Sequence, residues 1–141
     1  MHISALAGAA TAIAFAGVAT LVWPALPPIK IIEIRYDPAS EIFSLERVVR
    51  SSDPIYAPYN ILFVDAATER AVKECEVSDY ADFGPDEPRE QSWPLHDLAR
   101  PDCDGAMKQG GEYYAVMNVA PIGRKVSYSR TETFTIPLKG E

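Results

Sequence analysis

The sequence has little histidine, cysteine or basic charge. Two histidines and two cysteines leave few side chains for general-base catalysis or metal binding, and no phosphate-binding loop, zinc-protease or serine-hydrolase motif occurs. Thirteen basic against twenty acidic side chains give a formal net charge of −7, which argues against nucleic acid as a partner because nucleic acids select basic surfaces. We therefore predict no catalytic activity, no cofactor and no nucleic-acid binding.

The chain does have one long apolar stretch, residues 3–22, which contains no charged side chain. As a helix this stretch would be roughly 30 Å long, which matches the hydrocarbon core of a bilayer. Trp23 follows where an interfacial aromatic would sit, and the prolines of residues 24–28 predict a stiff linker. We predict a single-pass membrane anchor over residues 1–23, in contact with lipid through residues 3–22. Its small residues would also allow a second transmembrane helix to pack against it.

Two alternatives to an anchor stay open. Small-residue patterns ending at Ala16 and Ala19 resemble signal-peptide cleavage sites, and cleavage there would release a secreted or periplasmic soluble binding domain. The stretch could also be a buried helix of a soluble protein. Orientation is equally open, because Lys30 and Arg35 follow the stretch and no basic residue precedes it, which by the positive-inside rule favours a cytoplasmic domain.

The rest of the chain has the pattern of a β-rich domain. Twelve prolines disfavour long helices, and recurring Val, Ile, Tyr and Thr favour strands. We predict one domain over residues 29–137 with a tail at 138–141. We expect it to be all-β, as an Ig-like or fibronectin-like antiparallel β-sandwich. The predicted strands are residues 29–36, 43–50, 59–65, 70–78, 112–119 and 126–136.

Alternation predicts which side chains point inward. The first strand should place Ile32, Ile34 and Tyr36 on one face, and Arg47 interrupts the inward pattern of the second. The last strand should bury its aromatic and aliphatic positions and present a hydroxyl-rich outer face. Residues 51–58 and 79–110 are predicted as loops, with one helical turn over 93–98 that Pro94 would start. The inward positions of the last strand are Val126, Tyr128, Phe134 and Ile136.

The run from Gly111 to Ala115 resembles the strand-F corner of Ig-like domains, where a Gly and a Tyr precede a buried Cys. Here Ala115 holds the Cys position and Gln109 stands where an Asp is usual. The intersheet disulfide of antibody domains is therefore not expected.

Short motifs between residues 44 and 136 resemble those of small, uncharacterised membrane-anchored proteins of phages and prophages. The sequence departs from them at Glu69, where a turn Gly would be expected. The resemblance implies a membrane setting rather than an activity. The motifs are Val48-Val49-Arg50, Ile61-Leu62-Phe63-Val64-Asp65 with Thr68, Cys75, Trp93-Pro94-Leu95, Cys103, Gly111-Glu112-Tyr113 and Phe134-Thr135-Ile136.

The two cysteines, Cys75 and Cys103, predict a disulfide. Outside the cytoplasm two cysteines in one small domain usually pair, and closing this loop would stabilise the domain by roughly 3.5 kcal/mol. Free thiols and metal ligands are the alternatives. A disulfide favours an extracytoplasmic C-terminal domain, and we adopt that orientation.

Metal binding and catalysis have weak candidates. Cys75, His96 and Cys103 could meet at zinc, but the usual short ligand spacing is missing. Asp102 and Asp104 resemble part of a calcium loop without its closing Glu, so a solvated acidic loop is the default. His96 is the one plausible general base of a small enzyme, which is a further alternative.

We therefore predict a non-catalytic interaction or structural module, such as a phage-encoded or accessory subunit of a membrane assembly that contacts another protein. Loops at the ends of a β-sandwich often carry recognition. Trp93 could equally cover the core beneath its own loop. The candidate contact residues are Tyr80, Phe83, Trp93, His96, Ile122 and Arg124.

Overall fold

The computed structural model describes residues 26–139 of the chain. The predicted anchor at 1–23 with its interfacial Trp23, the first two residues of the proline linker (24 and 25) and the last two residues of the tail lie outside this range. Within residues 26–139, no helix combines the length and the apolar character that a membrane crossing needs.

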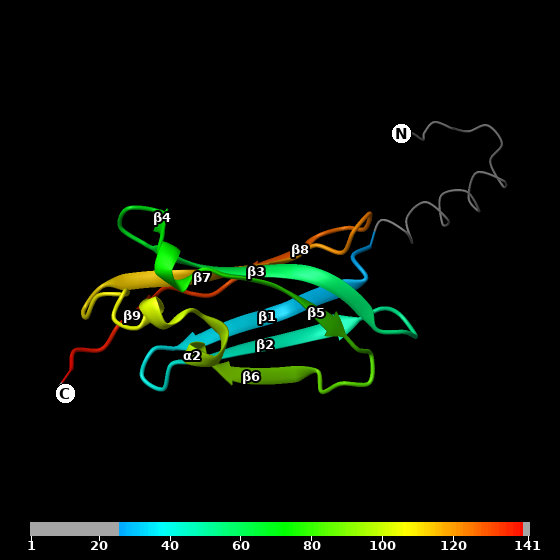
Figure 1. Ribbon diagram of the computed structural model, residues 1–141, viewed down its shortest axis with the longest axis horizontal. Coiled ribbons are helices and arrows are strands. Elements are labelled where there is room, and N and C mark those ends of the chain that lie inside the picture. Colours follow the sequence, from blue (N-terminus) through cyan, green and yellow to red (C-terminus); the bar gives the residue numbers. More distant parts are fainter. Residues whose placement is uncertain (1–25, 140–141) are drawn as a thin grey trace.

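The described part of the chain forms two antiparallel sheets, which confirms an all-β fold (Figure 1). The first sheet has the strand order β1-β2-β6, and the second has the order β4-β3-β7-β8 with β5 paired to β3 and β9 paired to β7. The strands are β1 (Ile29–Asp37), β2 (Ile42–Val49), β3 (Ile55–Asp65), β4 (Arg70–Ala71), β5 (Val77–Phe83), β6 (Glu90–Pro94), β7 (Glu112–Val119), β8 (Ser127–Arg130) and β9 (Phe134–Thr135), with three short helices, η2 (Lys73–Cys75), α2 (Leu95–Leu98) and η3 (Pro101–Cys103).

Both sheets contribute to one hydrophobic core. Phe43 of β2 and Phe63 of β3 are each 0% exposed, and Met117 of β7 is 3% exposed. Tyr36 of β1 meets Phe63 edge-on across the two layers, with 5.1 Å between ring centroids. Burial, with smaller contributions from Glu41 and Asp37, raises the pKa of Tyr36 above its ordinary value. Each large side chain removed from water in this way contributes roughly 1.5–3 kcal/mol.

In strand β1 the observed side-chain alternation differs from the predicted one. The pattern places Ile32 inward, yet Ile32 is 39% exposed while Ile31 and Ile34 are 5% and 2% exposed. The register against β2 shifts between Ile31 and Glu33, so a β-bulge reverses the side-chain parity. Both halves of β1 therefore bury apolar side chains, with odd-numbered residues inward before the bulge and even-numbered residues inward after it.

The predicted strand over 126–136 is wrong in extent, and its orientation is wrong in the first half, whereas Phe134 packs against the core as predicted. It divides into β8 and β9, and Val126 and Tyr128 are 51% and 57% exposed, whereas Ser127 is 7% exposed. The Ser127 hydroxyl accepts a hydrogen bond of 2.9 Å from the amide of Ile31, next to the bulge. The buried Thr131 hydroxyl similarly accepts one of 3.0 Å from the amide of Ala115. These hydroxyls face inward because they satisfy backbone donors that a strand partner leaves free.

Strand β3 begins earlier than predicted, at Ile55, so the second half of the predicted loop 51–58 is strand. The predicted strand 70–78 instead contains β4, η2 and the start of β5. The predicted loop 79–110 contains most of β5 and all of β6. These two edge strands lack an apolar period, because only Val77 and Phe83 of β5 are buried and no residue of β6 is fully buried. The predicted helical turn is α2, with Pro94 as its N-cap.

Candidate functional site

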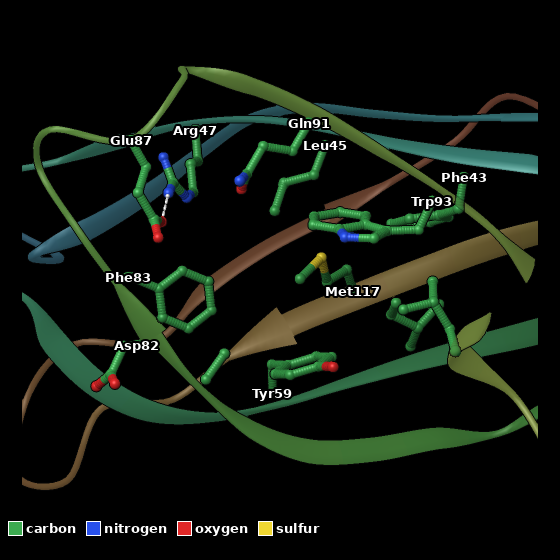
Figure 2. A pocket seen from close by; sticks show the side chains of 13 residues that line it. Phe43, Leu45, Arg47, Tyr59, Asp82, Phe83, Glu87, Gln91, Trp93 and Met117 are labelled. Carbon is green, nitrogen blue, oxygen red and sulfur yellow. Dashed lines mark hydrogen bonds and ion pairs between the residues drawn. The ribbon is translucent and has the colours of Figure 1, made fainter.

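A cavity of about 260 Å³ lies between the two sheets (Figure 2). Its floor is apolar and is built from Leu45 of β2, Ile61 of β3 and Met117 of β7. Phe83 of β5 and Trp93 of β6 line its two sides. The cavity is therefore a continuation of the hydrophobic core toward one side of the molecule.

The topology explains why this side is open. Within residues 26–139, β5 pairs with β3 and β6 pairs with β2, but β5 and β6 do not pair with each other. The chain passes between them through residues 84–89 without a strand. Ala81 of β5 lines the cavity with a short, half-buried side chain, which leaves the space unfilled.

Arg47 is the buried charged side chain that lines the cavity. It is 3% exposed, and its Nη2 donates a hydrogen bond of 2.6 Å to Oε1 of Glu87. Nη1 lies 3.4 Å from the carbonyl oxygen of Pro88, and the guanidinium lies 5.9 Å from the centroid of the Phe83 ring. Its Nε is buried and has no hydrogen-bond partner among the described residues. A buried unpaired donor costs about 1–3 kcal/mol.

Two carboxylates and one phenol complete the polar surroundings. Asp82 and Glu87 both line the cavity and also line a second hollow, together with Pro54 and residues 84–86. Burial, together with the Asp79 carboxylate, raises the pKa of Tyr59, which lines the cavity as a neutral phenol. Among these groups it is the Glu87 carboxylate that offsets the positive charge of Arg47.

The structure brings together only two of the six predicted contact residues, Phe83 and Trp93, at the cavity. Tyr80 is 54% exposed and stacks on Tyr56 instead, with 5.4 Å between centroids. The 82% exposed His96 side chain does not line the cavity, and its Nε2 lies 3.1 Å from Oδ1 of Asp97.

The other two predicted contact residues, Ile122 and Arg124, are exposed in the turn between β7 and β8, and Ile122 is 86% exposed. The sequence interpretation missed Arg47, Tyr59 and Glu87 as site residues. A signal for Arg47 was present, namely a charge at an inward position of the second strand.

The predicted disulfide is confirmed. Cys75 at the end of η2 and Cys103 at the end of η3 are bonded, with 4.5 Å between their Cα atoms. Both belong to the core cluster, at 0% and 7% exposure. Since both sulfurs are used in this bond, neither is available as a zinc ligand.

The weak calcium candidates are exposed. Oδ2 of Asp102 accepts a hydrogen bond of 3.3 Å from Arg100, and Asp104 lies in the following turn. In the part of the chain that the structure describes, no three His, Cys, Asp or Glu side chains gather as a metal site would require.

A hydrogen bond to Tyr113 stabilises the turn that precedes β7. The amide of Lys108 donates a hydrogen bond of 2.9 Å to the hydroxyl oxygen of Tyr113. A Cβ atom on Gly111 would lie 3.0 Å from the carbonyl oxygen of Lys108 and 3.1 Å from the Tyr113 hydroxyl, so this position fits glycine closely. Ala115, two residues after Tyr113, is 0% exposed.

Comparison with known proteins gives no family. No protein-family model and no curated protein sequence matches the chain. Among solved structures, the domain is similar to one described as a putative β-galactosidase from Bacteroides fragilis, with a TM-score of 0.45 and 12% sequence identity. The match covers 77% of this chain but only 16% of that protein, and a TM-score of this size supports no conclusion about function.

Proposed function

We propose that this chain is a non-catalytic binding module, anchored in a membrane by residues 3–22, with its domain on the extracytoplasmic side. The observation that carries the location is the Cys75–Cys103 disulfide, which is buried in the core. Such bonds form and persist in oxidising compartments and are rare in the cytosol. The orientation implied by Lys30 and Arg35 is outweighed by this bond.

The intersheet cavity supports a binding role. It joins an apolar floor to a buried hydrogen-bond donor, the Nε of Arg47, that has no partner among residues 26–139. Binding sites typically combine an apolar lining with a few polar groups. His96, the candidate general base, does not line the cavity, and its Nε2 lies 3.1 Å from Oδ1 of Asp97. A binding module therefore accounts for the arrangement better than an enzyme.

The finer fold and setting belong to the same proposal. The Tyr113–Lys108 hydrogen bond and the closely packed Gly111 are features of a tyrosine corner, which supports an Ig-like sandwich in which Ala115 replaces the usual cysteine. With the phage-like motifs, this suggests an accessory subunit of a membrane assembly that also contacts a protein partner.

The test measures the intact mass of the membrane-extracted full chain after thiol alkylation, performed both before and after reduction. We expect a full-length mass in the membrane fraction, with both cysteines alkylated only after reduction. A protease added to intact spheroplasts should also remove the domain. The Cys75→Ala/Cys103→Ala variant is the matched control, because it should take up no alkylating group in either order.

Two results would contradict the location. Full-length protein with freely alkylated cysteines and a protease-protected domain would place the domain in the cytoplasm. A mass shortened to a start after Ala16 or Ala19, found in the soluble fraction, would favour the second candidate, a released binding domain.

A further inference from the structure

The unpaired Nε of Arg47 points to what the cavity binds. Arg47 lies with Glu87 on one side and Gln91 and Leu45 on the other (Figure 2). Its two terminal nitrogens already contact Glu87 and Pro88, whereas Nε contacts no acceptor among residues 26–139. An Arg Nε–H cannot lose its proton at ordinary pH, so its unsatisfied state is relieved only by an incoming acceptor.

The charge balance selects a neutral acceptor. Glu87 already pairs with the Arg47 guanidinium through Nη2, so the positive charge next to Nε is already neutralised. An anionic ligand would bring a second negative charge next to Glu87 at the cost of its own hydration. A carbonyl oxygen accepts the same Nε–H hydrogen bond without that repulsion.

The size of the cavity bounds the rest of the ligand. An engineered apolar protein cavity of about 150 Å³ binds benzene, which has six carbon atoms. By proportion, a cavity of about 260 Å³ has room for roughly ten non-hydrogen atoms. Its floor of Leu45, Ile61 and Met117 offers these atoms only apolar contacts.

We propose that this cavity is a binding site for an uncharged acyl compound, whose apolar chain lies over the Leu45–Ile61–Met117 floor and whose carbonyl oxygen accepts a hydrogen bond from the Nε of Arg47. The inference names the ligand class of the proposed binding function. It does not depend on the side of the membrane on which the domain lies.

The experiment uses the full chain in lipid nanodiscs, with NMR detection of the Arg47 Nε–H resonance. Three probes of equal size are titrated: octanamide, which is neutral and carries a carbonyl; octanoate, its anionic analogue; and n-butylbenzene, which has no strong acceptor. We expect saturable octanamide binding that shifts the Nε–H resonance. Its affinity should exceed that of each other probe by about tenfold, the value of one buried hydrogen bond.

Variants separate the apolar floor from the donor. Arg47→Met keeps the side-chain stem but removes the donor, so it should bind n-butylbenzene and lose the preference for octanamide. Ala81→Leu fills the cavity and should bind neither probe. Ala71→Leu, at an exposed strand position outside the cavity, should bind as the unaltered chain does.

Three results would overturn the proposal: tighter binding of octanoate, equal binding of octanamide and n-butylbenzene with an unshifted Nε–H, or no binding of any probe. If Arg47→Met does not fold, the test is whether octanamide shifts the Nε–H resonance of the unaltered chain. Alkylation and protease access test the location separately, so a failure of one proposal is distinguishable from a failure of the other.

Discussion

Removing the Cys75–Cys103 bond should destabilise the domain strongly. The cysteines are 28 residues apart, and the chain-entropy estimate for a loop of that length is about 3.6 kcal/mol at 25 °C. Since a domain of this size has a total stability of about 5–15 kcal/mol, the loss is a large fraction of it. For about 110 residues, it corresponds to a decrease in Tm of roughly 15 °C.

The assay is thermal and urea unfolding of the full chain in nanodiscs, followed by near-UV circular dichroism, for the Cys75→Ala/Cys103→Ala variant. As a control, a reductant should lower the stability of the unaltered chain toward that of the variant and leave the variant unchanged. A loss of less than about 1 kcal/mol would refute the reasoning. It would mean that β5 and β6 hold the segment between the cysteines without a covalent link.

Three further predictions concern hydrogen bonds. Ser127→Ala should cost about 1–3 kcal/mol in urea unfolding because it leaves the buried amide of Ile31 unpaired, whereas Ser129→Ala should cost less than about 0.5 kcal/mol; equal costs would contradict this. Tyr113→Phe should cost about 1 kcal/mol, because the Lys108 amide loses its acceptor, and an unchanged urea midpoint would contradict it. Hydrogen bonds from Ser40 and the amide of Ala39 lower the pKa of Asp37, so its contribution is present above the ordinary Asp pKa of about 4 and is lost as the pH falls through the lowered value. The stability gap between the unaltered chain and Asp37→Asn should therefore shrink in acid, and a gap that does not change with pH would disprove that role.

The alternation of apolar and polar residues was sufficient to predict a strand that buries one face along its whole length. Strand β7 begins and ends where the pattern of Tyr113, Ala115, Met117 and Val119 predicts. The disulfide was predictable from the number of cysteines and the size of the domain.

The failures share a physical cause, which is that the deciding partner lies far away in the chain. The parity change in β1 depends on a bulge that Ser127 stabilises from a strand 96 residues later. Within residues 26–139, the edge strands β5 and β6 pair on one side only, so their sequences need no apolar period. Arg47 interrupts an apolar pattern because its partners, Glu87 and Pro88, come from a loop that alternation cannot place beside it.

The disulfide also affects which parts of this domain can vary in sequence. Cys75 and Cys103 join the ends of a segment that contains β5, β6 and α2, and thus one edge strand of each sheet. Both sides of the cavity, with Phe83 and Trp93, belong to this closed ring of chain, while its floor belongs to strands outside it. Sequence variation within the ring can therefore alter the shape and chemistry of the cavity while the floor strands keep their packing. For protein engineers, the positions within residues 76–102 that lie outside the core are the ones open to redesign, whereas Val77, Phe83 and Leu95 pack in the core and must be kept.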